Sequence, residues 1–173
     1  MLNGEKIYLR LLEQDDIQTL KDICDEENVK KYNIISDDDK GKEKVTLRKA
    51  FSIINKDKTL IGFITYKKNI YNMGLYILGI TIGSKYWNKG YGQESIKVFL
   101  NYLFNELNAY KVELEVMKNN IRAITCYKKC GFIEEIIKKS KNSLDHKYVD
   151  TIIMGITKDD FIKYEKIEKV SEK

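Results

Sequence analysis

Three β-rich segments in a row lead into a glycine-rich turn and then a helix, and this order limits the folds open to the chain. The segments span residues 49–55, 59–68 and 73–83 and are rich in β-branched and aromatic residues, which favour strands. Their connections are too short for a crossover, so neighbouring strands should run antiparallel. Apolar residues then recur with helical spacing over 92–107. The sequence therefore predicts a mixed α/β fold that begins with antiparallel strands, and not a doubly wound parallel sheet.

The rest of the chain continues this alternation without a linker, a repeat or a break in composition. The other elements are expected as a strand at 6–12, a helix that Asp15 or Asp16 caps, a polar loop with a short helical piece at 33–49, a strand at 110–117, a helix that Asn119 or Asn120 opens and Gly131 closes, and a hairpin of strands at 133–140 and 147–156. We therefore expect a single domain over residues 1–157, followed by a charged C-terminal helix or tail over 158–173.

The composition limits the cellular compartments and the kinds of partner that we expect for the protein. Of the 173 residues, 43% are hydrophobic, which is enough to build an ordinary core. No apolar run approaches the roughly 20 residues needed to span a bilayer, and the N-terminus is too charged for a secretory signal. Three cysteines without metal-ligand spacing argue against a disulfide framework and against a zinc site. We therefore expect a cytoplasmic protein with no metal and no membrane partner.

The stretch YWNKGYGQES (86–95) is the first candidate for a binding site. It joins a predicted strand to a predicted helix, and a helix N-terminus offers unpaired N–H donors and a partial positive charge. Gly90 and Gly92 carry no side chain that would keep a phosphate from those donors, and Lys89 adds a charge. A Walker A motif is absent, and a dinucleotide-binding turn would need glycine or alanine where Ser95 stands. The alternative is a glycine turn that merely joins strand to helix.

A second candidate is NNIRAITCYKKCGF (119–132). On a helix, Ala123, Tyr127 and Cys130 share one face, and Cys126 flanks them. Taken alone, a tyrosine on such a face is more often part of the core than a catalytic residue.

Together, the two stretches resemble the GNAT superfamily of acetyl-CoA-dependent N-acetyltransferases. The chain is most similar to the branch that contains the ribosomal-protein N-terminal acetyltransferases and the bacterial spermidine acetyltransferases. Two weaker segments, YLRLLEQDDIQTL (8–20) and ENVKKY (27–32), extend the resemblance to about residues 5–157. The resemblance implies a GNAT-like α/β (α+β) fold, whose mixed, mostly antiparallel sheet is splayed between its central strands and flanked by helices.

The resemblance also implies where acetyl-CoA binds. In this family one strand splays from its neighbour at a bulge, which would lie next to Gly79, and the pantetheine arm lies in the resulting V. The pyrophosphate would lie on the loop that begins at Trp87, which stands where many relatives have glutamine or arginine. The residues expected at acetyl-CoA are Ile80, Thr81, Ile82, Trp87, Asn88, Lys89, Gly90, Tyr91, Gly92, Gln93, Asn120, Arg122 and Lys129.

For the chemistry, the resemblance implies that an amine attacks the thioester directly, through a tetrahedral intermediate. A backbone N–H near Ile82 would stabilise the oxyanion. Tyr127 matches the tyrosine that protonates the departing thiolate, and a tyrosine suits this role because it is protonated at neutral pH. A ping-pong route through Cys126 or Cys130 is the alternative. We favour buried structural cysteines, since His146, the only histidine, is remote in sequence.

The general base is not apparent from the sequence. Many relatives carry a glutamate on the strand before the loop, where this chain reads LGITIG with Thr81 as its only polar side chain. Glu115 on the next strand, Asp150 on the last strand or a chain of waters could take its place. Each carboxylate also has a plainer interpretation, Glu115 as the solvent face of a strand and Asp150 as the cap of a turn.

The acceptor is expected to be a primary amine, on a polyamine or at the N-terminus of a basic peptide. The N-terminal third, which walls the acceptor side in this family, carries acidic clusters at 25–27 and at Asp37, Asp38 and Asp39. These clusters would attract a cation, although a solvated acidic loop explains them as well.

Other partners and roles stay open from the sequence. The acceptor could be a small amine, an amino acid or an aminoglycoside, and the domain could be a non-catalytic acetyl-CoA sensor or a homo-oligomer. The net charge of +5 suits a phosphate-bearing ligand, but a solvated lysine-rich face is a more common cause. No nucleic-acid partner is expected, because the lysine-rich stretches lack the signatures of the common RNA-binding folds.

Overall fold

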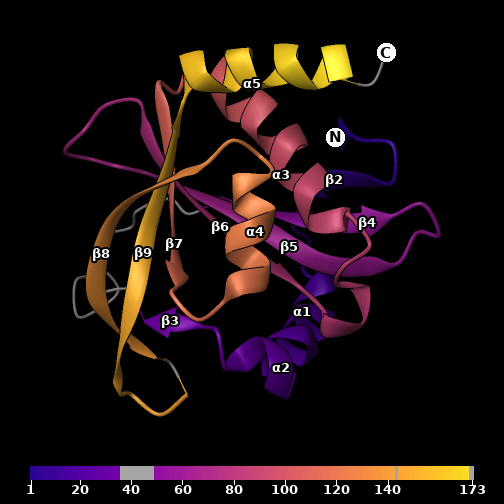
Figure 1. Ribbon diagram of the computed structural model, residues 1–173. Coiled ribbons are helices and arrows are strands. Elements are labelled where there is room, and N and C mark those ends of the chain that lie inside the picture. The colour runs from indigo at the N-terminus through magenta and orange to yellow at the C-terminus, as the bar shows by residue number, and fades with distance from the viewer. Residues whose placement is uncertain (36–48, 143, 172–173) are drawn as a thin grey trace.

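The computed structural model describes residues 1–35, 49–142 and 144–171. Within these residues nine strands form one sheet, in the order β1-β2-β4-β5-β6-β7-β9-β8-β3, with helices packed against it (Figure 1). The strands are β1 (Leu2–Asn3), β2 (Ile7–Leu11), β3 (Ile34–Ile35), β4 (Lys49–Asn55), β5 (Leu60–Lys68), β6 (Leu75–Ile82), β7 (Lys111–Met117), β8 (Ile133–Asn142) and β9 (Tyr148–Thr157). The helices are α1 (Asp16–Asp25), α2 (Glu27–Lys30), α3 (Tyr91–Asn101), α4 (Ile121–Lys128) and α5 (Lys158–Ser171).

Neighbouring strands pair antiparallel throughout the described sheet, except that β6 and β7 pair in parallel. This topology confirms the predicted mixed, mostly antiparallel fold. Three elements, β1, α2 and β3, are not expected from the sequence, because two-residue strands and a four-residue helix are too short to show a periodicity. Residues 36–48 of the predicted loop lie outside the described residues.

The sheet splits between β6 and β7. Their parallel pairing covers Leu75–Ile77 against Lys111–Glu113 and then ends. Beyond that point β6 stays paired with β5 as far as Ile82, whereas β7 stays paired with β9 as far as Met117. The two strands therefore diverge, and the predicted splay of the central strands is confirmed.

The bulge expected next to Gly79 is absent, because the β5–β6 pairing runs without a register shift through Thr65↔Gly79. The glycine has a different physical cause. A Cβ at position 79 would lie 2.9 Å from Thr65 Oγ1, so the bare backbone makes room for the threonine side chain.

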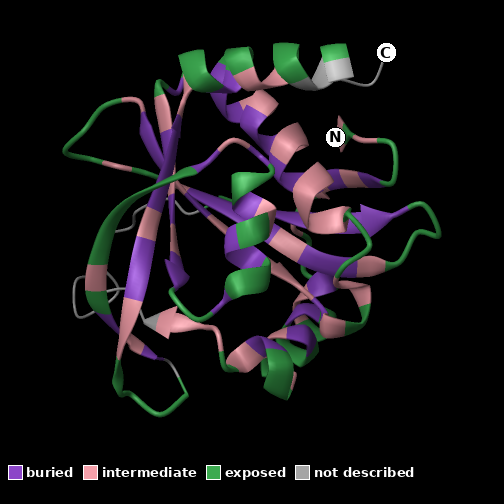
Figure 2. Ribbon diagram, in the orientation of Figure 1, coloured by how far each residue is buried: buried purple, intermediate pink, exposed green. Residues whose placement is uncertain are grey.

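Helix α3 supplies much of the core above the sheet. Ile96, Phe99 and Leu100 are fully buried on its inner face, and Figure 2 shows buried residues along this face and along the central strands. The predicted helix over 92–107 is not α-helical throughout. Its last part, Tyr102–Glu106, is a π-helical turn in which Leu107 N donates to Tyr102 O at 3.2 Å.

Both predicted ends of α4 are confirmed. Asn120 is the N-cap, and its side-chain oxygen accepts from Ala123 N at 3.3 Å. At the other end Gly131 has φ +90°, and Phe132 N donates to Tyr127 O while Gly131 N donates to Lys128 O, the bond pattern of a Schellman motif.

The segment after residue 157 forms helix α5, which lies across the end of α3 (Figure 1). Phe161 is buried with its ring centroid 5.3 Å from that of Phe104. Lys158 Nζ donates to the Phe104 carbonyl at 2.8 Å, which satisfies an acceptor at the end of the π-helical turn. None of the helices in the described ranges has the length and apolar character needed to cross a membrane.

The start of α1 differs from the prediction. Asp15 is the N-cap but makes no side-chain capping bond. Asp16 is 5% exposed, and its carboxylate accepts from both terminal nitrogens of Arg10 at 2.6 and 2.7 Å and from Ser52 Oγ at 2.6 Å. Asp16 thus joins α1 to β2 and β4. Its hydrogen bonds to Arg10 hold the pKa of its carboxyl group far below the usual value.

We predict that Asp16→Asn lowers the free energy of unfolding by about 1.5–3 kcal/mol at pH 7, the range for hydrogen bonds to charged groups. The folded-state pKa lies below the unfolded value near 3.8, so this stabilisation is present above about pH 4 and is lost as the pH falls through the folded-state pKa. Urea unfolding at pH 7 and at low pH measures the effect. Asp22→Asn, on the exposed face of the same helix, should change stability little; equal losses in the two variants would contradict the prediction.

Candidate active site

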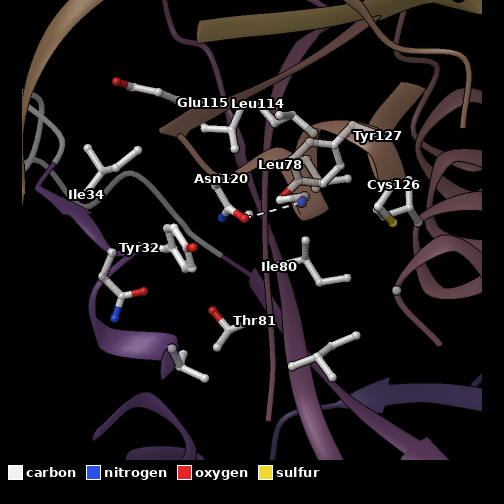
Figure 3. Close-up of a pocket in the computed structure, with 18 of the residues that line it drawn as sticks. Tyr32, Ile34, Leu78, Ile80, Thr81, Leu114, Glu115, Asn120, Cys126 and Tyr127 are labelled. Carbon is white, nitrogen blue, oxygen red and sulfur yellow. Dashed lines mark hydrogen bonds between the residues drawn. The ribbon is translucent and has the colours of Figure 1, made fainter. Parts of the chain in front are cut away.

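A cleft of about 510 Å³ fills the V between β6 and β7. Its walls come from β5, β6 and β7, from the loop before α3, from α4, and from the α1–α2–β3 segment. Figure 3 shows the two sides of β6 within it: Ile80 lies on the side of Cys126, and Thr81 lies on the side of Tyr32. The cleft therefore has a helical side, formed by α3 and α4, and an opposite side, formed by α2 and β3.

The backbone of β6 presents donors to this cleft that have no partner among the described residues. Gly83 N donates to Ile61 O across the β5–β6 ladder, and backbone N–H groups alternate in direction along a strand. The N–H groups of Ile80 and Ile82 therefore point away from β5, toward the side that β7 has left. The predicted residues Ile80, Thr81 and Ile82 all line the cleft.

The loop before α3 is built around two residues in the left-handed conformation. Asn88 has φ +60°, and Gly90, the N-cap of α3, has φ +83°. Trp87 turns back onto the strand, with its Nε1 donating to Ile82 O at 2.7 Å. Gly90 is thus required by its backbone conformation. Asn88, Lys89 and Gly90 are exposed at the surface and do not line the cleft, whereas Trp87 and Gly92 do.

Gly92 has no such conformational cause. A Cβ built there would lie 3.5 Å from Cys126 Sγ and 3.6 Å from Ile82 Cδ1, which are ordinary contacts. Neither packing nor dihedral angle demands a glycine at this position in the first turn of α3. The bare backbone leaves the N-terminus of α3 open toward the cleft.

Basic and polar side chains surround this helix end. The Arg122 guanidinium stacks over the Trp87 ring with its Cζ 3.5 Å from the ring centroid. Gln93 Nε2 donates to Lys129 O at 3.4 Å, which ties the loop to the end of α4. Tyr91 packs edge-on against Tyr86. Of these residues, Arg122 and Trp87 line the cleft, whereas Gln93, Lys129, Tyr91 and Tyr86 do not.

Helix α4 brings two further predicted residues into the cleft, Asn120 and Tyr127 (Figure 3). Tyr127 is 9% exposed, and none of the described residues hydrogen-bonds with its hydroxyl. Burial raises the pKa of that hydroxyl well above its usual value, and nearby Cys126 adds to the rise. The group is therefore a neutral donor at every physiological pH.

Cys126 in α4 and Cys130 just after its end differ. Cys130 is buried, and its Sγ lies 3.6 Å from Gln93 O, as expected for a structural cysteine. Cys126 is half-buried and lines the cleft. A hydrogen bond with Cys130 lowers the pKa of the Cys126 thiol, and the charges of Arg122 and Lys129 lower it further. His146 lies in the turn after β8 and outside the cleft lining.

Neither candidate base is free. The Glu115 carboxylate accepts from Ser140 Oγ and, at 2.7 Å, from Thr151 Oγ1, and it pairs with Lys138 Nζ at 3.0 Å. In Figure 3 it points away from Tyr127, although Glu115 belongs to the cleft wall. Asp150 pairs with Lys139, which lowers the pKa of its carboxyl group, and it lies outside the cleft lining.

The opposite side of the cleft contains Tyr32, the last residue of the ENVKKY segment, and Asn33, which the sequence does not single out. Behind them, Glu26 Oε2 accepts from Ser84 N at 2.7 Å, so the α1–α2 junction is fixed to the start of the loop. Glu26 belongs to the acidic cluster at 25–27. Its carboxylate binds the backbone of the loop and does not point into solvent, where a cationic ligand would approach. A contact across 58 residues of sequence leaves no local signal.

Asp37, Asp38 and Asp39 lie outside the described residues, so they cannot be placed relative to the cleft. Within the described ranges, no three His, Cys, Asp or Glu residues are grouped so that they could hold a metal ion.

The chain is similar in sequence and in fold to known N-acetyltransferases. A spermidine N(1)-acetyltransferase of Vibrio cholerae is 26% identical over 141 residues, which cover 76% of this chain and 82% of that protein. The N-acetyltransferase YnaD of Bacillus subtilis is 27% identical over 160 residues, which cover 85% of this chain and 94% of that protein. A crystal structure of the V. cholerae spermidine N-acetyltransferase in complex with CoA and spermine matches the fold with a TM-score of 0.76 at 24% identity, covering 92% of this chain and 99% of that one.

The model of the acetyltransferase (GNAT) domain family matches residues 6–133. This range contains the splayed strands β6 and β7, the glycine loop and α4, all of which meet at the cleft. The chain therefore belongs to the GNAT acetyltransferase family.

Proposed function

We propose that this enzyme moves the acetyl group of acetyl-CoA to a primary amine, and that a polyamine of the spermidine type is its acceptor. The observation that carries the proposal is a juxtaposition at one cleft. The outward N–H groups of Ile80 and Ile82 lie where β7 has diverged, and the buried Tyr127 hydroxyl has no hydrogen bond with any described residue. The first group can bind a carbonyl oxygen, and the second can give a proton to a leaving group.

The residues present fit acetyl-CoA, which supplies an acyl group already activated as a thioester. The open V has room for an extended chain, and its β6 edge offers backbone donors that no described residue pairs with. The N-terminus of α3 offers further donors, which Gly92 leaves uncovered. Arg122 adds a positive charge at the same end of the cleft. The other residues predicted at acetyl-CoA would contact it from the surface of this loop and from the end of α4: Asn88, Lys89, Gly90, Tyr91, Gln93 and Lys129.

In the proposed mechanism, each group of the chain has a separate task. The β6 N–H near Ile82 stabilises negative charge on the acyl oxygen as the amine attacks. Tyr127 donates its proton to the departing sulfur, and its raised pKa keeps that proton available. Asn120 caps the N-terminus of α4 and lines the same cleft. Direct attack is favoured over a ping-pong route because no histidine or carboxylate among the described residues pairs with the Cys126 thiol; its hydrogen-bond partner is the thiol of Cys130.

Removal of the amine proton is the most demanding step for the chain. A primary alkylamine has a pKa of about 10.4, so deprotonation at pH 7.4 costs about 4 kcal/mol. Glu115 is the acidic residue of the described cleft lining, and we keep it as the candidate base. Its carboxylate is already engaged by Lys138, so a water route from the amine fits the geometry equally well.

The choice of a polyamine rests on the V. cholerae relative and on the acidic residues Asp37, Asp38 and Asp39. The described cleft lining contributes no carboxylate other than the ion-paired Glu115. If those three aspartates do not reach the acceptor, the cleft would suit a smaller or less charged amine. An amino acid, an aminoglycoside or a basic peptide N-terminus is therefore the alternative acceptor.

The test is release of free CoA from acetyl-CoA in the presence of spermidine, a basic peptide, amino acids and an aminoglycoside. We expect the highest kcat/KM with spermidine, and Tyr127→Phe should lower kcat by roughly 10²–10⁴-fold because it removes one proton donor and keeps the ring. Tyr32→Phe, which also deletes a hydroxyl at the cleft, is the matched control and should lower kcat far less. No CoA release with any amine would overturn the enzymatic proposal, and an unchanged kcat in Tyr127→Phe would remove Tyr127 from the chemistry.

A second prediction concerns the first turn of α3. Gly92→Ala should weaken acetyl-CoA binding by at least about tenfold, roughly 1.4 kcal/mol, because the methyl group covers the donors that a phosphate would use. The melting temperature should stay close to that of the parent, since the methyl group meets only ordinary contacts. Calorimetric titration and a thermal melt measure the two effects. Gly90→Ala is the contrasting variant, because its φ of +83° predicts a loss of stability.

A third prediction separates direct attack from a ping-pong route. Cys126→Ser should keep kcat within about threefold of the parent, and parent enzyme mixed with acetyl-CoA alone should show no added acetyl mass. Mass spectrometry of the intact protein and of peptides containing residue 126 gives the measurement. An acetylated Cys126 that decays when spermidine is added would establish the ping-pong route instead.

A further inference from the structure

Two thiols lie together where the end of α4 meets the first turn of α3. The Cys126 thiol hydrogen-bonds with the thiol of Cys130, which lies just beyond the end of α4. Cys130 Sγ lies 3.6 Å from the Gln93 carbonyl oxygen, and a Cβ at Gly92 would lie 3.5 Å from Cys126 Sγ. Gly92 and Gln93 belong to the first turn of α3. The two thiols therefore contact the helix end at which we propose that the phosphates of acetyl-CoA bind.

Cys126 is the accessible member of the pair. It is half-buried and lines the cleft, and Figure 3 shows its side chain on the helical side, near Ile80. The hydrogen bond with Cys130 lowers the pKa of its thiol, and the charges of Arg122 and Lys129 lower it further. The thiolate is the form that attacks disulfides. A small molecule that enters the cleft therefore meets a thiol that ionises more readily than an ordinary one.

Cys24 gives an internal comparison. It is the third cysteine of the chain, and it lines the same cleft from α1. Burial raises the pKa of its thiol, and neighbouring Asp25 raises it further. The pKa values of two thiols that face one cleft are thus shifted in opposite directions. Reactivity toward disulfides should therefore belong to Cys126 and not to every cysteine of the chain.

The spacing of Cys126 and Cys130 suits an internal disulfide. On a helix, the Cβ atoms of residues four apart are about 5–6 Å from each other, and a disulfide needs about 3.5–4.5 Å. The required shift falls at a helix end, because α4 ends at Lys128 and Cys130 N donates to Tyr127 O in a tighter turn. Helix ends open more easily than helix interiors, so the two sulfur atoms can approach without unwinding the body of α4.

We propose that Cys126 and Cys130 form a thiol–disulfide exchange site, which low-molecular-weight disulfides oxidise to an internal disulfide that weakens acetyl-CoA binding. The Cys126 thiolate attacks one sulfur of R–S–S–R, forms a mixed disulfide and releases R–S⁻. Cys130 then loses its proton and attacks the Cys126 sulfur, which releases the second R–S⁻. Each R–S⁻ takes up one of the two protons that the cysteines lose. The small disulfide is thus reduced by two electrons to two thiols, and the two cysteines supply those electrons.

Oxidation and acetyl-CoA binding should oppose each other. The internal disulfide removes the thiol proton that Cys130 donates to Gln93 O, and it pulls on the end of α4, where the Lys129 carbonyl accepts from Gln93 Nε2. Both changes act on the first turn of α3, whose backbone donors would bind the phosphates. Conversely, bound acetyl-CoA would cover Cys126 in the cleft. This coupling rests on the proposed acetyl-CoA site, whereas the exchange chemistry depends only on the two thiols.

The experiment treats the full chain with glutathione disulfide at neutral pH and follows its intact mass and its peptide map over time. We expect the parent to lose the mass of two hydrogen atoms as Cys126 and Cys130 join, at least about tenfold faster than Cys24 gains an adduct. Cys130→Ser should stop at the mixed disulfide on Cys126, because the second attacking thiol is gone. Cys126→Ser should form no internal disulfide, and Cys24→Ser should react as the parent does. Acetyl-CoA added beforehand should slow the oxidation of the parent.

Calorimetric titration measures the coupling. The oxidised parent should bind acetyl-CoA at least about tenfold more weakly than the reduced parent, and a reducing agent should restore the affinity. In denaturant, Cys126 and Cys24 should react at similar rates, because the fold no longer separates their pKa values. Circular dichroism verifies that each variant folds, and Cys130→Ala replaces Cys130→Ser if a hydroxyl is not tolerated at this buried position.

Failure of this inference is distinguishable from failure of the proposed function. A folded parent that binds acetyl-CoA but forms no internal disulfide overturns the exchange site and leaves the proposed function intact. A parent that forms the disulfide but keeps its affinity for acetyl-CoA overturns the coupling. If the reduced parent does not bind acetyl-CoA, the proposed function fails, and the coupling fails with it. Faster reaction at Cys24 than at Cys126 would contradict the assignment of the reactive thiol.

Discussion

The early end of the β6–β7 pairing is the constraint on which the rest of the structure depends. Three residue pairs hold the two halves of the sheet together, and beyond Ile77 and Glu113 each strand follows its other neighbour. A continuous sheet would consume the N–H groups of Ile80 and Ile82 in a ladder. Because the strands diverge, these groups face a cleft, which α4 closes from one side and the α1–α2–β3 segment closes from the other. The cleft exists because β6 and β7 stop pairing before their ends.

Much of this arrangement can be predicted from the sequence, because its parts are local. The long strands, the amphipathic pattern of α3 and the ends of α4 at Asn120 and Gly131 all leave signals within a few residues. The parts that cannot be predicted depend on long-range contacts. Asp16 looks like an ordinary cap in sequence, but Arg10 and Ser52 from two strands make it a buried anchor. The pairing of Glu26 with the Ser84 amide is invisible for the same reason.

The glycines illustrate why the same candidate site can follow from an incomplete argument. The sequence suggests that Gly90 and Gly92 make room for a phosphate. In the structure Gly90 is explained by its left-handed backbone alone, and Gly79 by the Thr65 side chain rather than by a bulge. Only Gly92 lacks a conformational or packing cause. The inference of a ligand at this loop therefore depends on one glycine, together with the open helix end beside it.

The charge that the cleft offers to a ligand depends on which partner each nearby carboxylate already binds. The described cleft lining carries the Arg122 guanidinium over Trp87, whereas Glu115 is neutralised by Lys138 and fixed by two hydroxyl groups. Glu26, the residue of the N-terminal acidic cluster nearest the loop, accepts a hydrogen bond from the Ser84 backbone amide. The described cleft is therefore better suited to attract the phosphates of a cosubstrate than to attract a polycation. Cation selectivity, if the acceptor is a polyamine, must come from residues beyond this lining, and its salt dependence would then be that of solvent-exposed charges.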